Sequence, residues 1–224
     1  MTQIGTDGTA LGEGASVEAA EAAIVSMTSD SDLPGSVFGK IQLKSSKQTN
    51  TSVTISWKKV SKATSYVIYG NKCGINNKMK RLAVTKDKSM KFTKVLGKKI
   101  KKGTYYKFMV VALDKDNNVV SSSKIIHVAT KGGDVGNVGK ITTKAKRNKV
   151  SIKKGKTFKL AGKQVAASKK LKVRKHRAVT YESSNPKVAA VSKKGVITGK
   201  KKGTCYVYAY AQNGVFAKIK VTIK

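Results

Sequence analysis

The sequence predicts an all-β protein in which two β-sandwiches of the Ig-like or fibronectin type follow a flexible N-terminal leader. Three observations predict this class. Apolar and polar residues alternate with a period of two over most of the chain after residue 36. Turns rich in glycine, asparagine and lysine separate these short runs. A stretch with four glycines in ten residues, 131–140, divides the alternating part into two lengths that each suit one small sandwich.

These observations give four segments, which are a leader at 1–36, a first sandwich at 37–130, a hinge at 131–140 and a second sandwich at 141–224. The leader contains "ASVEAAEAAIVSM", a possible short helix with Ser16 as its cap. An isolated helix of this length is barely stable in water, so we expect a flexible leader. Docking of this segment on another chain is the alternative, because an acidic segment can pair with a basic neighbour.

The charge is distributed unevenly along the chain. Residues 1–39 contain six acidic residues and no lysine or arginine, whereas 47 basic residues against five acidic ones give residues 40–224 a net charge of +42. Such a body attracts polyanions, although salt screens the attraction beyond about 8 Å at physiological ionic strength. Only four basic residues are arginine, and lysine lacks the planar fork that reads phosphates or guanine edges. Three interpretations of this charge stay open: a solvated surface, binding to an anionic cell-envelope or mucosal polymer, and nonspecific nucleic-acid binding. We expect no specific nucleic-acid partner.

The strands of the first sandwich follow from the alternation. "VTISWKK" (53–59), "SYVIYG" (65–70) and "TYYKFMVVAL" (104–113) are predicted strands, and "VVSSSKIIHVAT" closes the segment. About seven strands are expected. The residues predicted to face inward from the first three are Val53, Ile55, Trp57, Tyr66, Ile68, Tyr106, Phe108, Val110 and Ala112. Tyr105, Lys107, Met109 and Val111 are predicted to lie on the opposite face.

This segment resembles fibronectin type III domains. "SVTISWKKVSKATSYVIYG" is similar to the second and third strands of that family, with Trp57 as the core tryptophan. "GTYYKFMVVA" resembles the sixth strand, in which Tyr106 would be the tyrosine-corner residue that ties a crossover loop to the sheet. The resemblance implies that Trp57, Tyr66, Tyr106 and Phe108 are structural core residues. The chain has no Arg-Gly-Asp tripeptide, so integrin-type adhesion is not implied.

The second segment resembles bacterial Ig-like domains of group 2. The resemblance rests on an aromatic residue, Tyr181, followed by "SSNP", "VAAV", "GVITG" and "GT". Most members carry tryptophan where Tyr181 stands, and Tyr181 is expected in the core. "KQVAASKKLKVRKHRAV" (163–179) is longer and more basic than usual in the family. We therefore expect this insertion to have a role specific to this chain.

Short turns shape this second segment. Gly195, Gly199 and Gly203 are expected to supply backbone angles that residues with a Cβ resist. Pro186 is expected to end strand pairing after an asparagine turn. This stretch encodes a β building block, and none of its residues suggests a reaction.

The best candidate binding surface lies on the last two strands, "TCYVYAYA" and "VFAKIKVTIK". Strand phase places Cys205, Val207 and Ala209 toward the core. If the two strands pair, a tyrosine ladder lies exposed beside a row of lysines. Packing of lysine stems on tyrosine rings is one interpretation. Stacking of sugars or docking of a neighbouring subunit is the other. The candidate binding residues are Tyr206, Tyr208, Tyr210, Phe216, Lys218 and Lys220.

The residues of enzymes and metal sites are sparse. His127 and His176 have no carboxylate motif beside them, and a folded body with five acids offers little for acid–base pairs. "DKDNN", with Asp114 and Asp116, clusters oxygen ligands as a calcium loop does, but we expect a solvated turn. Cys73 and Cys205 are 132 residues apart and have no zinc-type spacing. No catalytic residue, cofactor or metal is predicted.

Two separate thiols are favoured over a disulfide between Cys73 and Cys205. The N-terminus has no signal-peptide pattern, and "FMVVAL" is too short to span a membrane. The two resemblances imply a non-catalytic spacer, adhesion or envelope-attachment module of secreted and cell-surface proteins of Gram-positive bacteria. A virion decoration or fibre protein is the alternative, because Ig-like domains also occur on phage particles. A nonspecific nucleic-acid binder is the third class.

Overall fold

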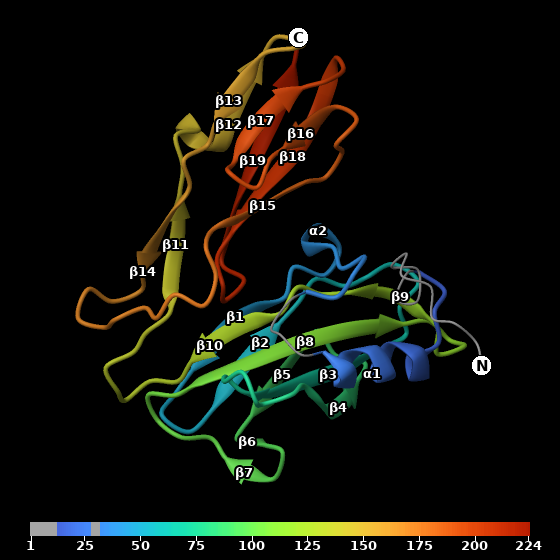
Figure 1. The fold of residues 1–224 in the computed structure, drawn as a ribbon, viewed down its shortest axis with the longest axis vertical. Coiled ribbons are helices and arrows are strands. Elements are labelled where there is room, and N and C mark those ends of the chain that lie inside the picture. Colours follow the sequence, from blue (N-terminus) through green and yellow to red (C-terminus); the bar gives the residue numbers. More distant parts are fainter. Residues whose placement is uncertain (1–12, 28–31) are drawn as a thin grey trace. The chain divides into compact units, whose positions relative to one another are not determined.

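The structure is a computed structural model that describes residues 13–27 and 32–224. The chain divides into two compact units, one up to Val135 and one from Gly136 (Figure 1). The division falls inside the glycine-rich stretch 131–140, which the sequence predicted as a hinge.

The first unit is built from two antiparallel sheets. One sheet has the order β1-β2-β5, and the other has the order β10-β8-β3-β4, with β9 also paired to β8. The strands are β1 (Lys44–Gln48), β2 (Val53–Ser56), β3 (Ser65–Lys72), β4 (Lys80–Thr85), β5 (Ser89–Phe92), β8 (Tyr105–Leu113), β9 (Val119–Ser122) and β10 (Ile126–Ala129). A short helix, α2 (Phe38–Ile41), precedes β1, and a small hairpin of β6 (Lys94–Val95) and β7 (Lys98–Lys99) precedes β8. This is the sandwich predicted for the segment, with the predicted closing strand split into β9 and β10.

The core of the first unit lies between the two sheets. Trp57 and Tyr66 pack edge to face with ring centroids 5.4 Å apart, and both are buried. Phe108 stacks on Phe92 across the two sheets at 5.2 Å. The inward positions predicted on β2, β3 and β8 are buried, since alternation places every second side chain toward the facing sheet.

The opposite face of the β3–β8 sheet is also covered. All nine residues of β8 are buried, including Met109 and Val111, which the alternation had placed away from the core. The N-terminal segment covers them through helix α1 (Val17–Ser26), which lies beside β3 and β4 (Figure 1). Its Ala20 and Ile24 belong to one buried cluster with Met109 and Val111. Ile24 has no exposed surface.

The prediction of a flexible leader is therefore wrong for residues 13–27 and 32–36, which form a third layer of the first unit. Hydrogen bonds also hold this segment, because Gly14 N–H donates to Val119 O at 2.8 Å and Val119 N–H donates to Ala15 O at 2.7 Å. Ile125 N–H donates to the Asp32 carboxylate at 2.9 Å. A short helix that is marginal alone gains its stability from tertiary burial. Residues 1–12 of the predicted leader lie outside the described residues.

The acids of the N-terminal segment pair with bases of the same unit. Glu13 lies 3.5 Å from Lys40, Glu21 lies 3.7 Å from Arg81, and Asp32 lies 3.9 Å from Lys124. The acidic segment thus meets a basic neighbour within its own chain. Burial, with Glu21 close by, raises the pKa of Tyr69 beneath the helix to about 12.

The second unit contains a four-stranded and a three-stranded sheet, with a separate two-stranded ribbon. The orders are β12-β19-β18-β15, β13-β17-β16 and β11-β14, and only the β12–β19 pair is parallel among these pairs. The strands are β11 (Val138–Thr142), β12 (Lys149–Ile152), β13 (Thr157–Lys159), β14 (Lys163–Ala166), β15 (Thr180–Ser183), β16 (Ala189–Val191), β17 (Val196–Gly199), β18 (Gly203–Tyr210) and β19 (Phe216–Ile223). A 3-10 turn, η2 (Lys146–Asn148), precedes β12.

Tyr181 is half-buried and packs against this second core, where the resemblance had placed it. Its hydroxyl accepts a hydrogen bond from Gly162 N–H at 2.9 Å, and its ring lies against Gly195. A Cβ on Gly195 would stand 2.5 Å from Tyr181 Cζ, and Gly195 also has φ +74°. Glycine is required there both for space and for backbone angle.

The prediction of special backbone angles at three glycines holds for Gly195 and for Gly203, which has φ +148°. It is wrong for Gly199, whose φ is not in the left-handed region. Glycine at 199 instead allows close strand approach, because a Cβ would lie 3.0 Å from Lys153 O. The strand β15 ends at Ser183, before Pro186, as expected. The side chain of Asn185 forms the expected turn around Pro186, because its Oδ1 accepts a hydrogen bond from Lys187 N–H at 3.1 Å.

Residues on each side of the predicted hinge contact their own unit. A Cβ on Gly133 would lie 2.6 Å from Gly103 Cα, and Lys131 N–H donates to Thr49 O at 3.1 Å. On the other side, Gly136 N–H donates to Lys172 O at 3.1 Å. These glycines allow close backbone approach within each unit.

Candidate functional site

The tyrosine-bearing strands pair with each other, which was the condition attached to the predicted binding face. In the β18–β19 ladder, Tyr206 lies opposite Lys220, Tyr208 opposite Lys218, and Tyr210 opposite Phe216. Cys205, Val207 and Ala209 face the core and are buried. The six candidate binding residues therefore share the outer face of these two strands.

The predicted exposed ladder of three tyrosines is nevertheless wrong. Tyr206 is 38% exposed, but Tyr208 and Tyr210 are only 6% and 3% exposed. The ring of Tyr208 packs edge to face on half-buried Phe216 at 5.9 Å. Aromatic pairs of this kind remove ring surface from water.

The exposed tyrosine of this face, Tyr206, is in contact with a lysine. Lys218 Nζ lies 3.9 Å from the ring centroid of Tyr206. A cation over an aromatic face is an attractive contact of about 0.5–1 kcal/mol at an exposed site. This arrangement is the packing of lysine on tyrosine that was one of the two interpretations of the sequence. The exposed part of the face reduces to Tyr206, Lys218 and Lys220.

The "DKDNN" segment is held as a turn by its own carboxylate. Asp114 Oδ1 accepts the N–H groups of Asp116 and Asn118, both at 2.9 Å. Lys115 Nζ lies 2.8 Å from the Asp116 carboxylate. This pattern is an aspartate-capped turn, in which the Asp114 carboxylate accepts backbone N–H groups.

The two cysteines are free thiols in different environments. Cys73 is half-buried, with its Sγ 3.3 Å from Nδ1 of the buried His127. Cys205 is buried, and burial raises the pKa of its thiol despite an opposing hydrogen bond with Ser183. The environment of Cys205 therefore disfavours the thiolate that reactive cysteines need.

The basic insertion at 163–179 begins with β14 and continues as a loop that the β18–β19 turn holds. Gln212 Oε1 accepts His176 N–H at 2.8 Å, and Gln212 Nε2 donates to Arg174 O at 2.9 Å. Gln164 Nε2 donates to Arg177 O at 3.0 Å. The loop thus has side-chain contacts to a buried glutamine of its own unit.

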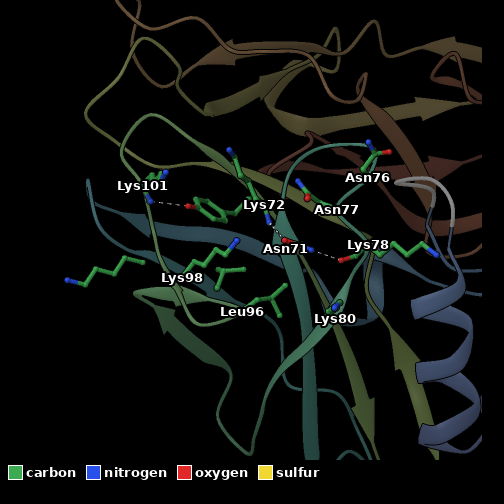
Figure 2. Close-up of a pocket in the computed structure, with 12 residues that line it drawn as sticks. Asn71, Lys72, Asn76, Asn77, Lys78, Lys80, Leu96, Lys98 and Lys101 are labelled. Carbon is green, nitrogen blue, oxygen red and sulfur yellow. Dashed lines mark hydrogen bonds between the residues drawn. The ribbon is translucent and has the colours of Figure 1, made fainter.

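A lysine-rich cleft in the first unit was missed by sequence reasoning (Figure 2). Its volume is about 600 Å³, which lies within the range of ligand pockets. Six lysines line it, with three asparagines and a partly apolar floor. The lining residues are Lys72, Lys78, Lys80, Lys98, Lys99, Lys101, Asn71, Asn76, Asn77, Val95, Leu96 and Tyr106. We call this site the lysine cleft.

Two loops form the walls of the lysine cleft. The first runs from the end of β3 to the start of β4, where Asn71 accepts Lys72 N–H and donates to Lys78 O, both at 2.7 Å (Figure 2). The second is the β6–β7 hairpin, whose turn has positive φ at Leu96 and at Gly97. These two walls are separated in sequence, so no single motif marks the cleft.

Tyr106 ties the second wall to the sheet. Its hydroxyl accepts a hydrogen bond from Lys101 N–H at 2.9 Å, and the ring is 5% exposed. This contact between a crossover loop and the sheet is the tyrosine corner that the resemblance implied. A structural core residue therefore fixes the position of the lysines at 98–101.

The second unit is similar to a known family of domains. Residues 137–222 match the bacterial Ig-like domain (group 2). The match covers β11 to β19 and includes the basic insertion. It confirms the resemblance that was read from Tyr181 and the glycine turns. No curated protein matches the chain.

Solved structures similar to the chain include several fibronectin type III domains. The FN5 domain of Drosophila Lar is 25% identical, with 41% of this chain and 92% of that chain covered and a TM-score of 0.32. A domain of human fibronectin type III domain containing protein 3 is 19% identical, with 41% and 86% covered and a TM-score of 0.33. The fn3 domain of human collagen alpha-1(XX) chain is 14% identical, with 43% and 86% covered and a TM-score of 0.34.

The strand orders and the family match together define tandem β-sandwich units. The bacterial Ig-like match of the second unit suggests a binding or display module. Among the described residues, no helix combines the length and apolar character that a membrane crossing requires.

Proposed function

We propose that this protein is a non-catalytic attachment or display module of a Gram-positive bacterial surface, and that it binds an anionic polymer of the cell envelope through its lysines. One observation carries the proposal. Residues 40–224 contain 47 basic residues and only five acidic ones. A positive charge of this size on two compact units attracts polyanions.

The position of the acids supports the proposal. Within the described residues, acids of the N-terminal segment pair with Lys40, Arg81 and Lys124 of the first unit. The six lysines of the cleft and the lysines of the β18–β19 face are exposed to solvent. These ammonium groups are available for many weak contacts along one polymer, and many weak contacts give useful avidity.

Lysine in place of arginine favours a polymer that is recognised by charge rather than by sequence. Of the 47 basic residues, 43 are lysine, a compact charge without bidentate geometry. Base-specific readout in nucleic acids relies largely on arginine forks and on stacking aromatic rings. This composition supports an envelope polymer over a specific nucleic acid.

Binding to purified Gram-positive cell walls tests the proposal. Walls with and without their anionic polymer are incubated with the full chain at 0.15 M and at 0.5 M salt, where screening lengths are about 8 Å and 4 Å. We expect retention at 0.15 M salt that requires the polymer and weakens at 0.5 M salt. Equal retention on stripped walls, or no retention on either, would contradict the proposal.

A further inference from the structure

We infer that the lysine cleft of the first unit is the site that binds the polymer, and that its ligand is a polyol-phosphate chain, a flexible phosphodiester polymer with free hydroxyl groups. This inference rests on the proposed function and gives it a location and a ligand class. Sequence analysis had placed binding on the tyrosine face of the second unit instead.

The charge of the cleft is one-sided. Lys72, Lys78 and Lys80 come from the first wall, and three further lysines come from the β6–β7 side (Figure 2). None of the residues that line the cleft is acidic. The six ammonium groups repel one another across a concave surface, and a polyanion that enters relieves this repulsion. A concave basic site concentrates anions more strongly than lysines spread on a convex surface.

The neutral groups of the cleft suit a polyol. Asn76 is exposed at the rim and carries both a donor and an acceptor for hydroxyl groups. Leu96, which is 39% exposed, provides apolar surface on which the carbon atoms of a glycerol or ribitol unit can rest. Ammonium, amide and small apolar groups together match the alternating phosphates, hydroxyls and short carbon chains of a polyol phosphate.

Other polyanions lack matching groups here. Nucleic-acid strands gain affinity by stacking bases on aromatic rings, but the one aromatic residue that lines the cleft, Tyr106, is 5% exposed. Carboxylate polymers are best held by the arginine fork, and no arginine lines the cleft. Single-point lysine donors suit a phosphate oxygen.

Matched triple variants of the full chain test the site. The cleft variant carries Lys72→Gln, Lys98→Gln and Lys101→Gln, which removes charge from both walls. The control variant carries Lys44→Gln, Lys86→Gln and Lys88→Gln, three exposed lysines of the same unit outside the cleft. The two variants have the same net charge, so only the position of the lost charge differs.

The probe is purified poly(glycerol phosphate), measured by isothermal titration calorimetry at 0.1 M salt, with poly-L-glutamate and an oligo-dT strand of matched charge as comparators. We expect the cleft variant to bind at least tenfold more weakly than the wild type and the control variant to lose less than threefold. The slope of log K against log salt should fall by about 2 in the cleft variant, if each lost contact contributes about 0.7 as on single strands. Fluorescence of Trp57 in urea shows whether each variant keeps the wild-type fold.

The outcomes separate the inference from the proposed function. If the wild type binds none of the three polyanions, both are wrong. If it binds poly(glycerol phosphate) and the two triple variants weaken equally, the cleft is not the site, although the proposed function stands. Tighter binding of poly-L-glutamate or oligo-dT than of poly(glycerol phosphate) would overturn the ligand class.

Discussion

The burial of Ile24 in the third layer of the first unit predicts how much a substitution there lowers the free energy of unfolding. This side chain has no exposed surface and packs in one cluster with Val67, Met109 and Val111 of the sheet. Replacing a fully buried isoleucine with alanine costs about 2–5 kcal/mol in free energy of unfolding, because it removes apolar contacts and leaves a cavity. Ile24→Ala should therefore destabilise the first unit by this amount.

The neighbouring Val25 provides a matched control. Val25 is 42% exposed on the same helix, and Val25→Ala also exchanges a β-branched residue for the best helix former. We expect this control to change the unfolding free energy by less than about 0.5 kcal/mol. The difference between the two variants isolates burial from helix propensity.

The assay is urea unfolding followed by tryptophan fluorescence. Trp57 is the single tryptophan of the chain and lies in the core between the two sheets of the first unit. Its signal therefore reports on the unit that α1 covers. If Ile24→Ala and Val25→Ala shift the urea midpoint equally, the helix does not pack as a structural layer and the reasoning is refuted.

Further predictions concern glycine space, the tyrosine corner and alkaline stability. Gly195→Ala should lower the free energy of unfolding by about 3 kcal/mol or more, because the new Cβ meets the ring of Tyr181. Gly155→Ala, at φ +77° with no atom within 4 Å, should lower it by only about 1–2 kcal/mol. Calorimetry of the two full-length variants compares these losses, and equal losses would contradict the steric argument. Tyr106→Phe should lower the unfolding free energy of the first unit by about 1 kcal/mol through loss of the crossover-loop hydrogen bond, and an unchanged urea midpoint would refute this role. The pKa of Tyr69 is raised from 10.0 to about 12, so its contribution to stability is present below pH 10 and lost as the pH rises through 12. Tyr69→Phe should remove this part of the loss of stability at high pH. If the urea midpoint falls equally between pH 9 and pH 11 in the wild type and in the variant, the raised pKa of Tyr69 does not contribute.

The inner faces of the strands could be predicted from the sequence because each strand has a strict alternation. Trp57, Tyr66 and Phe108 are buried where the period of two placed them. The common outer face of Tyr206 and Lys220 also followed from strand phase once the two strands were taken to pair. Local pattern is sufficient for these features, since a strand presents every second side chain to one face.

The outer layer could not be predicted by the same reasoning. Met109 and Val111 were correctly placed opposite the sandwich core, but alternation does not say what covers that face. Their apolar character was the available signal, since a face open to water usually carries polar residues. The helix with Ala20 and Ile24 was visible in the sequence, and only its tertiary contact was missing.

The lysine cleft lay outside the reach of sequence reasoning for a different reason. Its walls are the segments "KCGINNKM" and "GKKIKKG", each of which has the composition of a turn. Lys72 and Lys101 line the same cleft through the fold, although they are 29 positions apart in the sequence. Tyr208 and Tyr210 illustrate the opposite limit, because strand phase gives the face of a side chain and not its exposure.

A nuclear magnetic resonance titration of the ¹⁵N-labelled full chain with poly(glycerol phosphate) at 0.1 M salt locates the binding site directly. We expect the largest amide shifts in residues 71–80 and 95–101, the two walls of the lysine cleft. Largest shifts around Tyr206 and Lys218, or shifts of equal size at lysines throughout both units, would contradict this expectation.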